Sequence, residues 1–571
     1  MEDAPKPGWM RAGSAVLVAC ALAYAVAGSV LLRHRAFWSP DQAVRFVQVE
    51  VLARSKEVPV PYPAADLDPE GRFFPAGSWF HFARAGKHYL SYLPYFSALT
   101  APLYATFGWP GLLFLPGFAG LASVWVTLRF LGDRASGGAA LGGLGLGLGS
   151  PLLLYAASFW DHALAVAVAA GGCFLAVHAL ERASLRMLGL AGFVLGLGFW
   201  IRNEMYVLAV GVLMGWLFGG TPRAHGAVAL GGGVLAAGLP LWGANTALFG
   251  HPLGYKGASL AVSRAEALAT AAGGGREWIG QRLLVAYYQL VNTDFYGLTW
   301  HHLWTSLGVT GALAGATLVL RIGVRRRSER IVALGGILAV ASVLFVVVGR
   351  SAVSGLLPAF PALLLAFLPG RRERWEKFLW AVCLVFAVGV VATGTRGGVQ
   401  WGPRYLLPIL PALSWLAFAA VDRCRAHFPE VWPALRGVAA ALVGAGVLIQ
   451  ASGVDQLEQW TARNRAGMEG LRRAPTEVVV TSSEWIALLA GPVYFEKKLM
   501  LVGSLEELEA LVRNFARRRV PRWTYVPASG ARFTPVYVLR WSRTAGWPYQ
   551  VAEDRMDPES GLRLVTFEVS R

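Results

Sequence analysis

Residues 12–32 read AGSAVLVACALAYAVAGSVLL, an unbroken apolar run that is long enough to cross a bilayer as a helix. A long polar stretch, 33–89, follows this run and includes Ser39-Pro40-Asp41 near its start. Further apolar runs then fill the chain as far as about residue 450. Because backbone groups in hydrocarbon must be hydrogen-bonded within the protein, the pattern predicts a polytopic α-helical membrane protein.

The composition supports the same fold class. The chain of 571 residues is 55% hydrophobic and only 15% charged, whereas a typical soluble domain is about 25% charged. The mean hydropathy is +0.48. Most of the chain therefore has no polar face to offer to water. The four cysteines show neither a disulfide framework nor zinc-ligand spacing.

The net charge of +18 could indicate nucleic-acid binding, but the distribution of the basic residues argues against it. They cluster in short loops between apolar runs, such as Arg321, Arg325, Arg326, Arg327 and Arg330, or Arg371, Arg372, Arg374 and Lys377. Cytoplasmic loops carry such an excess. We expect a multi-pass protein of the plasma (inner) membrane with a cytoplasmic N-terminus and no nucleic-acid partner. The first run, preceded by Lys6 and Arg11, is interpreted as an uncleaved signal anchor rather than a cleaved signal peptide.

Apolar length and flanking charge predict about thirteen membrane spans. These are 12–32, 110–130, 136–155, 159–180, 187–201, 205–219, 227–249, 301–320, 331–349, 351–368, 377–394, 403–420 and 434–451. The Tyr- and Pro-rich segment 89–107 is predicted to be an interfacial helix, because counting it as a span would place the Arg clusters outside. Alternation then puts two large loops, 33–109 and 250–300, on the extracytoplasmic side.

The composition changes after about residue 452. The residues predict three strands (477–482, 498–502 and 522–526) and two helices (484–490 and 504–518). Ser504 and Glu507 have the spacing of a capping box. We therefore predict a membrane module over 1–451 and a small extracytoplasmic α/β domain over 452–571.

Asp41 is the first candidate for chemistry. Trp38 is typical of the membrane interface, and Pro40 can start a helix whose first turn holds Asp41. A carboxylate at a bilayer surface is well placed to act as a general base on a lipid-borne substrate. The alternative is a helix-terminal charge that interacts with the helix dipole.

Asp161 and His162 open a predicted span at its outer end. The pair could act in acid–base chemistry, bind a metal, or combine a capping Asp with an interfacial His. A metal would need further ligands, so a divalent ion stays a possibility without a defined site.

Two arginines occupy the outer ends of predicted spans, against the positive-inside rule. Arg202 lies in the turn Arg202-Asn203-Glu204 between two short spans, and Arg404 lies in Gly402-Pro403-Arg404-Tyr405. A guanidinium can clamp a phosphate with two parallel hydrogen bonds. The alternative for Arg202 is an ion pair with Glu204 or Asp161 that holds helices together. Lys87, His88 and Tyr255 are further candidates for sugar or headgroup contacts in the two loops.

In this order the motifs resemble the GT-C glycosyltransferases, including protein O-mannosyltransferases and bacterial aminoarabinose transferases (family 39-like). An acidic residue, Asp41, follows the first span, and the loop contains Gly86-Lys87-His88-Tyr89. A basic turn at Arg202 and a late element, Arg404-Tyr405-Leu406-Leu407-Pro408, complete the pattern. The resemblance covers about residues 10–450.

The resemblance implies that Asp41 is the catalytic base of an enzyme that transfers a sugar from a polyprenyl-phosphate donor to a lipid, glycan or protein acceptor. Many members have a second acid beside the first; here that position is Gln42, so Asp161 is the candidate for the second catalytic charge. His162, Arg202, Glu204, Arg404 and Tyr405 would bind substrate. No cofactor besides the lipid-linked donor is implied with certainty.

Two other classes remain open. A transporter or flippase for lipid-linked glycans also needs many spans and outward arginines, although no internal repeat is visible and the candidate charges cluster at outer helix ends. A non-catalytic receptor or assembly factor could use the C-terminal domain.

Overall fold

The computed structural model describes residues 7–219, 223–255, 275–294, 299–393, 397–528 and 548–570. Lys6 and a large part of the predicted loop 250–300 lie outside these ranges. The chain divides into two compact units. Unit 1 comprises Met1–Val30 and Leu112–Gln456, and unit 2 comprises Leu31–Gly111 and Leu457–Arg571. The pairing of the segment 31–111 with the C-terminal segment in one unit was not predicted from the sequence.

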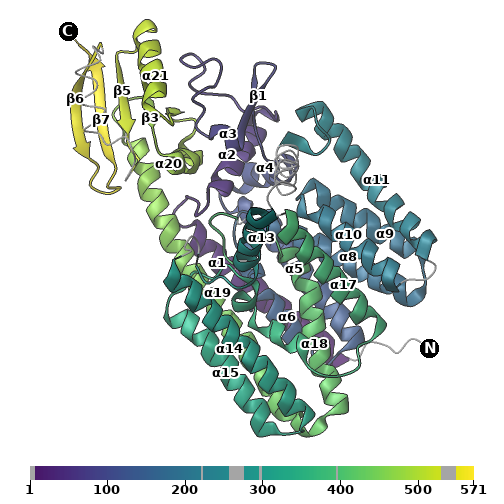
Figure 1. Cartoon of the computed structure of the whole chain (residues 1–571). Coiled ribbons are helices and arrows are strands. Elements are labelled where there is room, and N and C mark those ends of the chain that lie inside the picture. Colours follow the sequence, from purple (N-terminus) through teal and green to yellow (C-terminus); the bar gives the residue numbers. More distant parts are fainter. Residues whose placement is uncertain are drawn as a thin grey trace. The chain divides into compact units, whose positions relative to one another are not determined.

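Unit 1 is built from helices (Figure 1). They are α1 (Pro7–Leu32), α5 (Gly111–Arg134), α6 (Ala139–Gly147), α7 (Leu152–Ala156), α8 (His162–Arg182), α9 (Leu185–Leu197), η1 (Gly198–Trp200), α10 (Glu204–Gly219), α11 (Arg223–Phe249), α13 (Gly275–Leu290), α14 (Trp300–Arg325), α15 (Glu329–Val348), α16 (Leu356–Ala359), η2 (Pro361–Phe367), α17 (Arg374–Thr393), η3 (Leu407–Ile409), α18 (Leu410–His427), η4 (Pro429–Val431) and α19 (Trp432–Arg472). The end of α1, the start of α5 and the last turns of α19 continue into unit 2.

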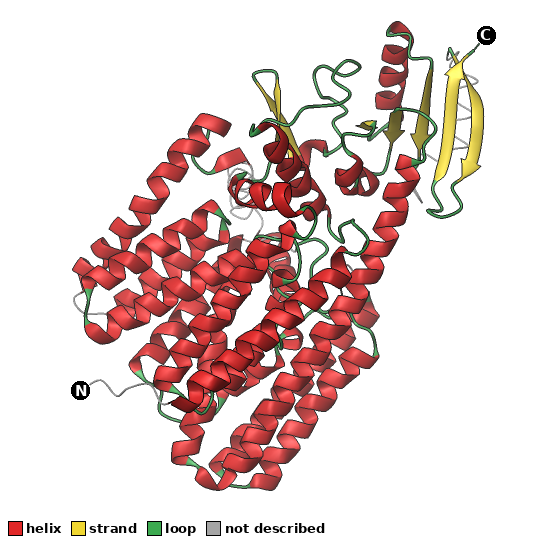
Figure 2. Cartoon of the chain, turned by 180° about the vertical axis from the view of Figure 1, so that it is seen from behind, coloured by secondary structure: helices red, strands yellow, loops and turns green. Residues whose placement is uncertain are grey.

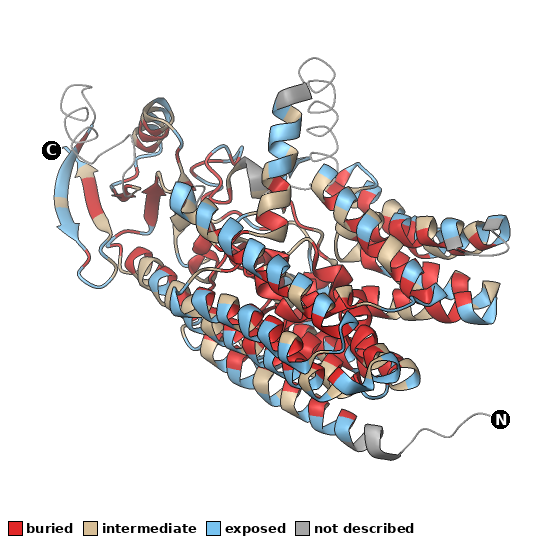
Figure 3. Cartoon of the chain, turned by 60° about the horizontal axis from the view of Figure 1, so that its bottom comes forward, coloured by how far each residue is buried: buried red, intermediate tan, exposed pale blue. Residues whose placement is uncertain are grey.

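Within the described residues, nine helices are long and apolar enough to cross a membrane. They are Ala12–Leu32, Gly111–Arg134, His162–Arg182, Ala224–Phe249, Trp300–Arg325, Glu329–Val348, Arg374–Thr393, Leu407–His427 and Pro429–Arg472, with two shorter apolar helices at Leu185–Trp200 and Glu204–Phe218. The prediction of a polytopic helical membrane protein is confirmed, whereas the predicted number of about thirteen membrane spans is not. The apolar helices have exposed surfaces (Figure 3), and these carry large apolar side chains such as Phe118, Phe218 and Val348. Helices that face lipid require such surfaces.

Two predicted spans are not continuous helices. The segment 136–155 divides into α6 and α7, and the segment 351–368 consists of the short helix α16 and the 3-10 helix η2. Proline explains both breaks, because Pro151 follows the end of α6 and Pro361 starts η2, and proline has no backbone N–H to continue a preceding helix. Neither segment forms one rod across the bilayer.

Unit 2 contains the strands of the described structure (Figure 2). Its elements are α2 (Pro40–Ser55), α3 (Gly77–Phe80), β1 (His81–Arg84), β2 (Lys87–Leu90), α4 (Tyr95–Phe107), β3 (Val478–Thr481), α20 (Glu484–Leu489), η5 (Gly491–Val493), β4 (Lys498–Leu501), α21 (Leu505–Arg517), β5 (Arg522–Val526), β6 (Tyr549–Met556) and β7 (Arg563–Val569). The segment 89–107, predicted to be an interfacial helix, contains α4, whose 13 residues are too few to span the membrane and expose Leu99 and Phe107.

The C-terminal sheet has the strand order β4-β3-β5-β7-β6. Strand β3 runs parallel to β4 and β5, and β7 pairs antiparallel with β5 and β6. The three predicted strands and two predicted helices are confirmed, but β6 and β7 were missed. The Ser504 hydroxyl caps α21 as expected, accepting from Glu507 N at 3.2 Å; the Glu507 carboxylate accepts from Gly503 N at 2.6 Å rather than from Ser504, so the box is only half formed.

Residues of the first loop share a hydrophobic core with this sheet. Val44, Tyr62 and Phe74 belong to the same buried cluster as Met500 and Trp523. The loop backbone also bonds the sheet, since Leu501 N donates to Phe73 O at 2.9 Å. The predicted loop 33–109 is therefore a folded layer of unit 2, and α2 packs with it into the same core as the sheet.

A buried histidine pair in unit 2 predicts acid sensitivity. His81 Nε2 lies 2.9 Å from His88 Nδ1, and the His81 ring stacks on Phe74 at 3.8 Å. Burial, together with the neighbouring His88, lowers the pKa of His81 to about 3. Burial also lowers the pKa of His88, although Asp68 opposes this shift. An unfolded histidine, with a pKa of about 6.5, binds a proton that the folded pair excludes.

We expect the stability that this neutral pair contributes to be fully present above about pH 6.5 and to fall as the pH drops below that value. For His81 the fall continues towards pH 3, by up to about 1.4 kcal/mol per pH unit. Thermal unfolding in detergent at a series of pH values measures this slope. His81→Asn should flatten it. An equal slope in the variant and the wild type would contradict the assignment.

Candidate active site

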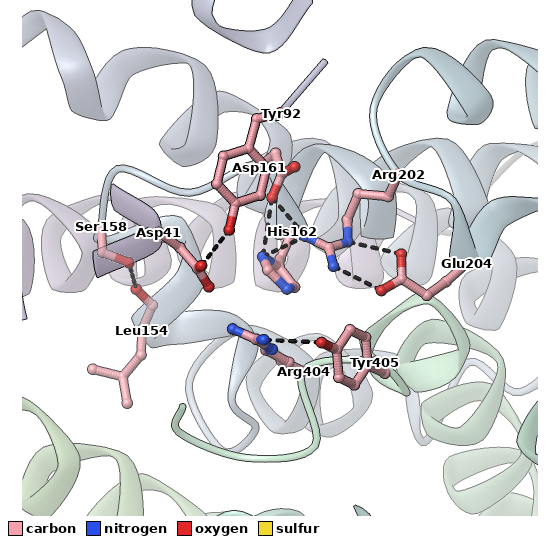
Figure 4. Close-up of polar contacts among 10 residues, drawn as sticks. All are labelled: Asp41, Tyr92, Leu154, Ser158, Asp161, His162, Arg202, Glu204, Arg404 and Tyr405. Carbon is pink, nitrogen blue, oxygen red and sulfur yellow. Dashed lines mark hydrogen bonds and ion pairs between the residues drawn. The ribbon is translucent and has the colours of Figure 1, made fainter. Parts of the chain in front are cut away.

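Asp41 lies in the first turn of α2, as the sequence predicts. Ser39 is the N-cap residue and Pro40 takes the first helical position, where its missing N–H costs nothing. The Asp41 side chain is partly exposed, and its Oδ1 accepts a hydrogen bond from the Tyr92 hydroxyl (Figure 4). A solvent-accessible carboxylate held in one orientation is suited to accept a proton.

A row of polar side chains on α2 holds Tyr92 in place. The Arg45 guanidinium lies over the Tyr92 ring at 4.2 Å, and Gln48 Nε2 donates to Tyr92 O at 2.9 Å. Ser97 Oγ in turn donates to Gln48 Oε1 at 3.0 Å. Asp41, Arg45 and Gln48 recur at helical spacing, so one face of α2 carries them all. Sequence analysis missed Tyr92 and Arg45; the one-turn spacing from Asp41 to Arg45 was the available signal.

Asp161 and His162 lie at the start of α8 in unit 1, where Asp161 is the N-cap residue. Both side chains are fully buried, at 0% and 1% exposure, and His162 Nδ1 lies 3.1 Å from Asp161 Oδ1. Asp161 makes no side-chain capping bond to the helix. Its carboxylate faces Arg202 instead.

Arg202 is the centre of the polar cluster in unit 1. Its Nε and Nη2 donate to the two oxygens of Glu204, at 3.1 and 2.7 Å, and its Nη1 donates to Asp161 Oδ1 at 2.9 Å (Figure 4). Burial alone would lower the pKa of Arg202, but Glu204 and Asp161 raise it overall, so the guanidinium stays charged. Of the two interpretations of Arg202, the ion pair that joins helix ends is realised: it connects the start of α8 to the start of α10.

Removing this guanidinium should destabilise unit 1 strongly. We expect Arg202→Gln to lower the free energy of unfolding by about 3–5 kcal/mol, because two buried carboxylates lose their partner. Thermal and denaturant unfolding in detergent measure the change. Arg350→Gln is the matched control: its ion pair with Asp455, at 2.5 Å, is 62% and 57% exposed and should contribute about 0–1 kcal/mol. Equal effects of both variants would contradict this assignment.

Arg404 lies in an anchored loop ahead of η3, and not at a helix start as the sequence suggested. Gly402 has a φ of +67°, and a Cβ at this position would clash with Pro151. Buried Trp401 donates from Nε1 to Gln450 Oε1 at 3.0 Å, and Gln450 Nε2 donates to Ala359 O at 2.9 Å. These contacts fix the backbone that presents Arg404.

The observed contacts of the Arg404 side chain include a hydroxyl and two aromatic rings. Its Nη2 donates to the Tyr405 hydroxyl at 2.9 Å, and its guanidinium lies 4.9 Å from the Tyr405 ring and 5.9 Å from the Trp160 ring (Figure 4). The positive charge of Arg404 also acts on Arg202, so the two guanidinium groups belong to one cluster.

The remaining predicted contacts are dispersed. Lys87 is exposed on β2, His88 is buried against His81, and Tyr255 is half-buried beyond the end of α11. In the described part of the chain, no group of three or more His, Cys, Asp or Glu side chains is arranged to hold a metal ion. Asp161 and His162 alone do not form a metal site, and Asp161 is already occupied by Arg202.

The fold, with its broken and continuous spans, its folded first loop and its C-terminal sheet, is similar to that of solved structures with the GT-C membrane fold. A crystal structure of ArnT from Cupriavidus metallidurans bound to undecaprenyl phosphate matches it at a TM-score of 0.51, with 16% identity, over 97% of each chain. The apo form of ArnT matches at 0.50, with the same identity and coverage. An apo oligosaccharyltransferase from Archaeoglobus fulgidus matches at 0.50, with 11% identity, over 90% of this chain and 69% of that one.

No family model matches the chain. No curated protein matches it either. At these identities the likeness establishes the fold, which confirms the fold expected from the order of the motifs.

Proposed function

We propose that this protein is a membrane glycosyltransferase that moves a sugar from a polyprenyl-phosphate donor to a lipid, glycan or protein acceptor on the extracytoplasmic side. The single observation that carries the proposal is the oriented carboxylate of Asp41, which directly follows the first span in a chain with the GT-C fold. The undecaprenyl phosphate held by ArnT supports a lipid phosphate as the leaving group.

Asp41 is the general base of the proposed reaction. Its carboxylate takes the proton from the acceptor, and the acceptor atom forms a bond to the anomeric carbon of the sugar. The bond from that carbon to the phosphate oxygen breaks, and its electron pair leaves with the polyprenyl phosphate. Because this leaving group is already a stable anion, it needs little protonation. The Tyr92 hydroxyl bonds one carboxylate oxygen, Oδ1, and thereby fixes the direction of the other.

Arg404 is the proposed contact of the departing phosphate. Its guanidinium donates to the Tyr405 hydroxyl, and its positive charge acts on the neighbouring Arg202, which itself donates to Glu204 and Asp161. Positive charge aimed at a developing anion lowers the barrier to its departure. In this proposal Asp161 and Glu204 position Arg202, and His162 and Tyr405 line the same cluster.

A donor labelled in both the sugar and the polyprenyl phosphate separates this proposal from a flippase. The purified protein in liposomes should release free polyprenyl phosphate when an acceptor is supplied. Movement of intact donor between the leaflets without release would favour a transporter instead. The enzyme is preferred because the candidate charges lie outside the midpoints of spans: Asp161 caps the start of α8, Arg202 lies in the turn before α10, and Arg404 lies in the loop before η3.

A further inference from the structure

A polar pocket lies within unit 2, and the proposed reaction does not use the residues that line it. The cavity has a volume of about 390 Å³. Its charged lining comprises Arg33, Arg35, Arg465, Arg472, Glu50 and Glu469, four arginines against two glutamates. The cavity is therefore basic.

The charges of two of these arginines are already compensated. Arg33 pairs with Glu458, and Arg472 pairs with Glu469 at 2.5 Å and Glu496 at 2.7 Å. In contrast, the side chains of Arg35 and Arg465 make no hydrogen bond or ion pair with any residue that the structure describes. The excess positive charge of the pocket thus resides on Arg35 and Arg465.

The carboxylates of the pocket oppose an anion weakly. Glu50 pairs with Arg54, and Glu469 pairs with Arg472. Burial raises the pKa of Glu50, against the lowering effect of Arg54, so that this carboxyl gains a proton more readily than an ordinary glutamate.

Aromatic side chains form an apolar wall beside these charges. The rings of Phe46 and Trp109 stack at 4.9 Å, and Tyr104 meets Phe46 edge-on at 5.4 Å. All three residues line the cavity. A wall of this kind suits the apolar part of a ligand whose anionic group contacts the arginines.

Chain connectivity places the pocket at the membrane surface. Arg33 and Arg35 lie within three residues after Leu32, the last residue of the first candidate span, and Trp109 lies two residues before Gly111, where the next span starts. Arg465 lies about two turns, or about 11 Å of helix rise, beyond Glu458, the partner of Arg33. The ends of spans lie near the lipid headgroups, where Trp and Tyr are enriched.

Arg35 also holds a backbone conformation that favours glycine, with a φ of +48°. Its N–H donates to Leu32 O at 2.9 Å, which closes the turn after the span. Left-handed conformations of residues with a side chain are costly and gather at binding sites. The turn fixes the point at which the Arg35 side chain leaves the backbone.

We propose that this pocket binds the phosphate headgroup of an anionic membrane lipid, with Arg35 and Arg465 contacting the phosphate and Tyr104 and Trp109 lying along the glycerol and upper acyl chain. The site is separate from the donor phosphate contact proposed at Arg404 and does not depend on the transfer reaction. A guanidinium binds phosphate through paired, charge-assisted hydrogen bonds.

Native mass spectrometry of the whole protein in detergent, titrated with phosphatidylglycerol, tests the proposal. The double variant Arg35→Gln/Arg465→Gln should weaken binding by about tenfold, while phosphatidylcholine binding stays unchanged. The matched control is Arg84→Gln/Arg463→Gln, which removes two exposed arginines outside the pocket and should retain wild-type affinity. Thermal unfolding confirms that both variants fold.

Three results would overturn the proposal. These are unchanged phosphatidylglycerol affinity in the pocket variant, an equal loss in the control variant, and binding of glycerol phosphate or inorganic phosphate as tight as that of the lipid. The last result would identify a free phosphate as the ligand. Arg465→Glu, a charge reversal at an exposed position, provides a second variant if the double variant is unstable, and it should weaken binding more than Arg465→Gln does.

Discussion

Asp41→Asn is expected to lose sugar transfer by about 10²–10⁴-fold while the protein still inserts and folds, because the amide cannot accept the acceptor's proton. The substitution keeps the size of the side chain, and the amide oxygen can still accept from the Tyr92 hydroxyl. The contacts that hold α2 against the rest of unit 2 come from Val44, Val47 and Val51, which are unchanged. Release of labelled polyprenyl phosphate in liposomes measures the rate.

Two further variants control this experiment. Asp41→Glu retains a carboxylate at a displaced position and should keep more activity than Asp41→Asn. Glu57→Gln removes an exposed carboxylate just beyond the end of α2 and should leave the rate unchanged. Near-normal turnover in Asp41→Asn would remove Asp41 from the mechanism.

Arg404→Gln should lower the transfer rate by about 10²–10³-fold, because the proposed leaving phosphate loses its guanidinium. The loop that presents this residue should stay folded, since Trp401 and Gly402 provide its anchoring contacts. The same release assay measures the effect, and thermal unfolding monitors the fold.

Arg404→Lys provides the matched comparison. Lysine keeps the charge but loses the planar fork and its stacking over the rings of Tyr405 and Trp160. It should therefore recover part of the activity lost in Arg404→Gln. An unchanged rate in Arg404→Gln would move the phosphate contact to another residue.

The elements that the sequence predicts well are those with strong local signals. The long spans were predicted from the length of the apolar runs. The start of α2, with Asp41 in its first turn, was predicted from Pro40. Ser504 located the start of α21. Apolar length also predicted single spans where the structure has two shorter helices, at Pro151 and Pro361. Hydropathy contains no information about the backbone N–H that proline lacks.

The site could be predicted only in part, because its geometry depends on contacts between distant segments. Asp161 and Arg202 meet although 41 positions separate them, and the sequence offered the ion pair only as one of two alternatives. The hydroxyl on Asp41 comes from Tyr92, 51 positions away, one of several tyrosines in its segment that nothing local distinguishes. Strands β6 and β7 were missed because they are defined by pairing between segments: β6 pairs with β7, and β7 also pairs with β5.

Single-turnover kinetics at saturating donor test the central claim most directly, because they separate donor binding from the chemical step. Proton removal by Asp41 predicts that Asp41→Asn binds the labelled donor with wild-type affinity but releases polyprenyl phosphate at least about 10²-fold more slowly. A wild-type release rate in this variant, or a loss of donor affinity that accounts for the whole defect, would contradict it.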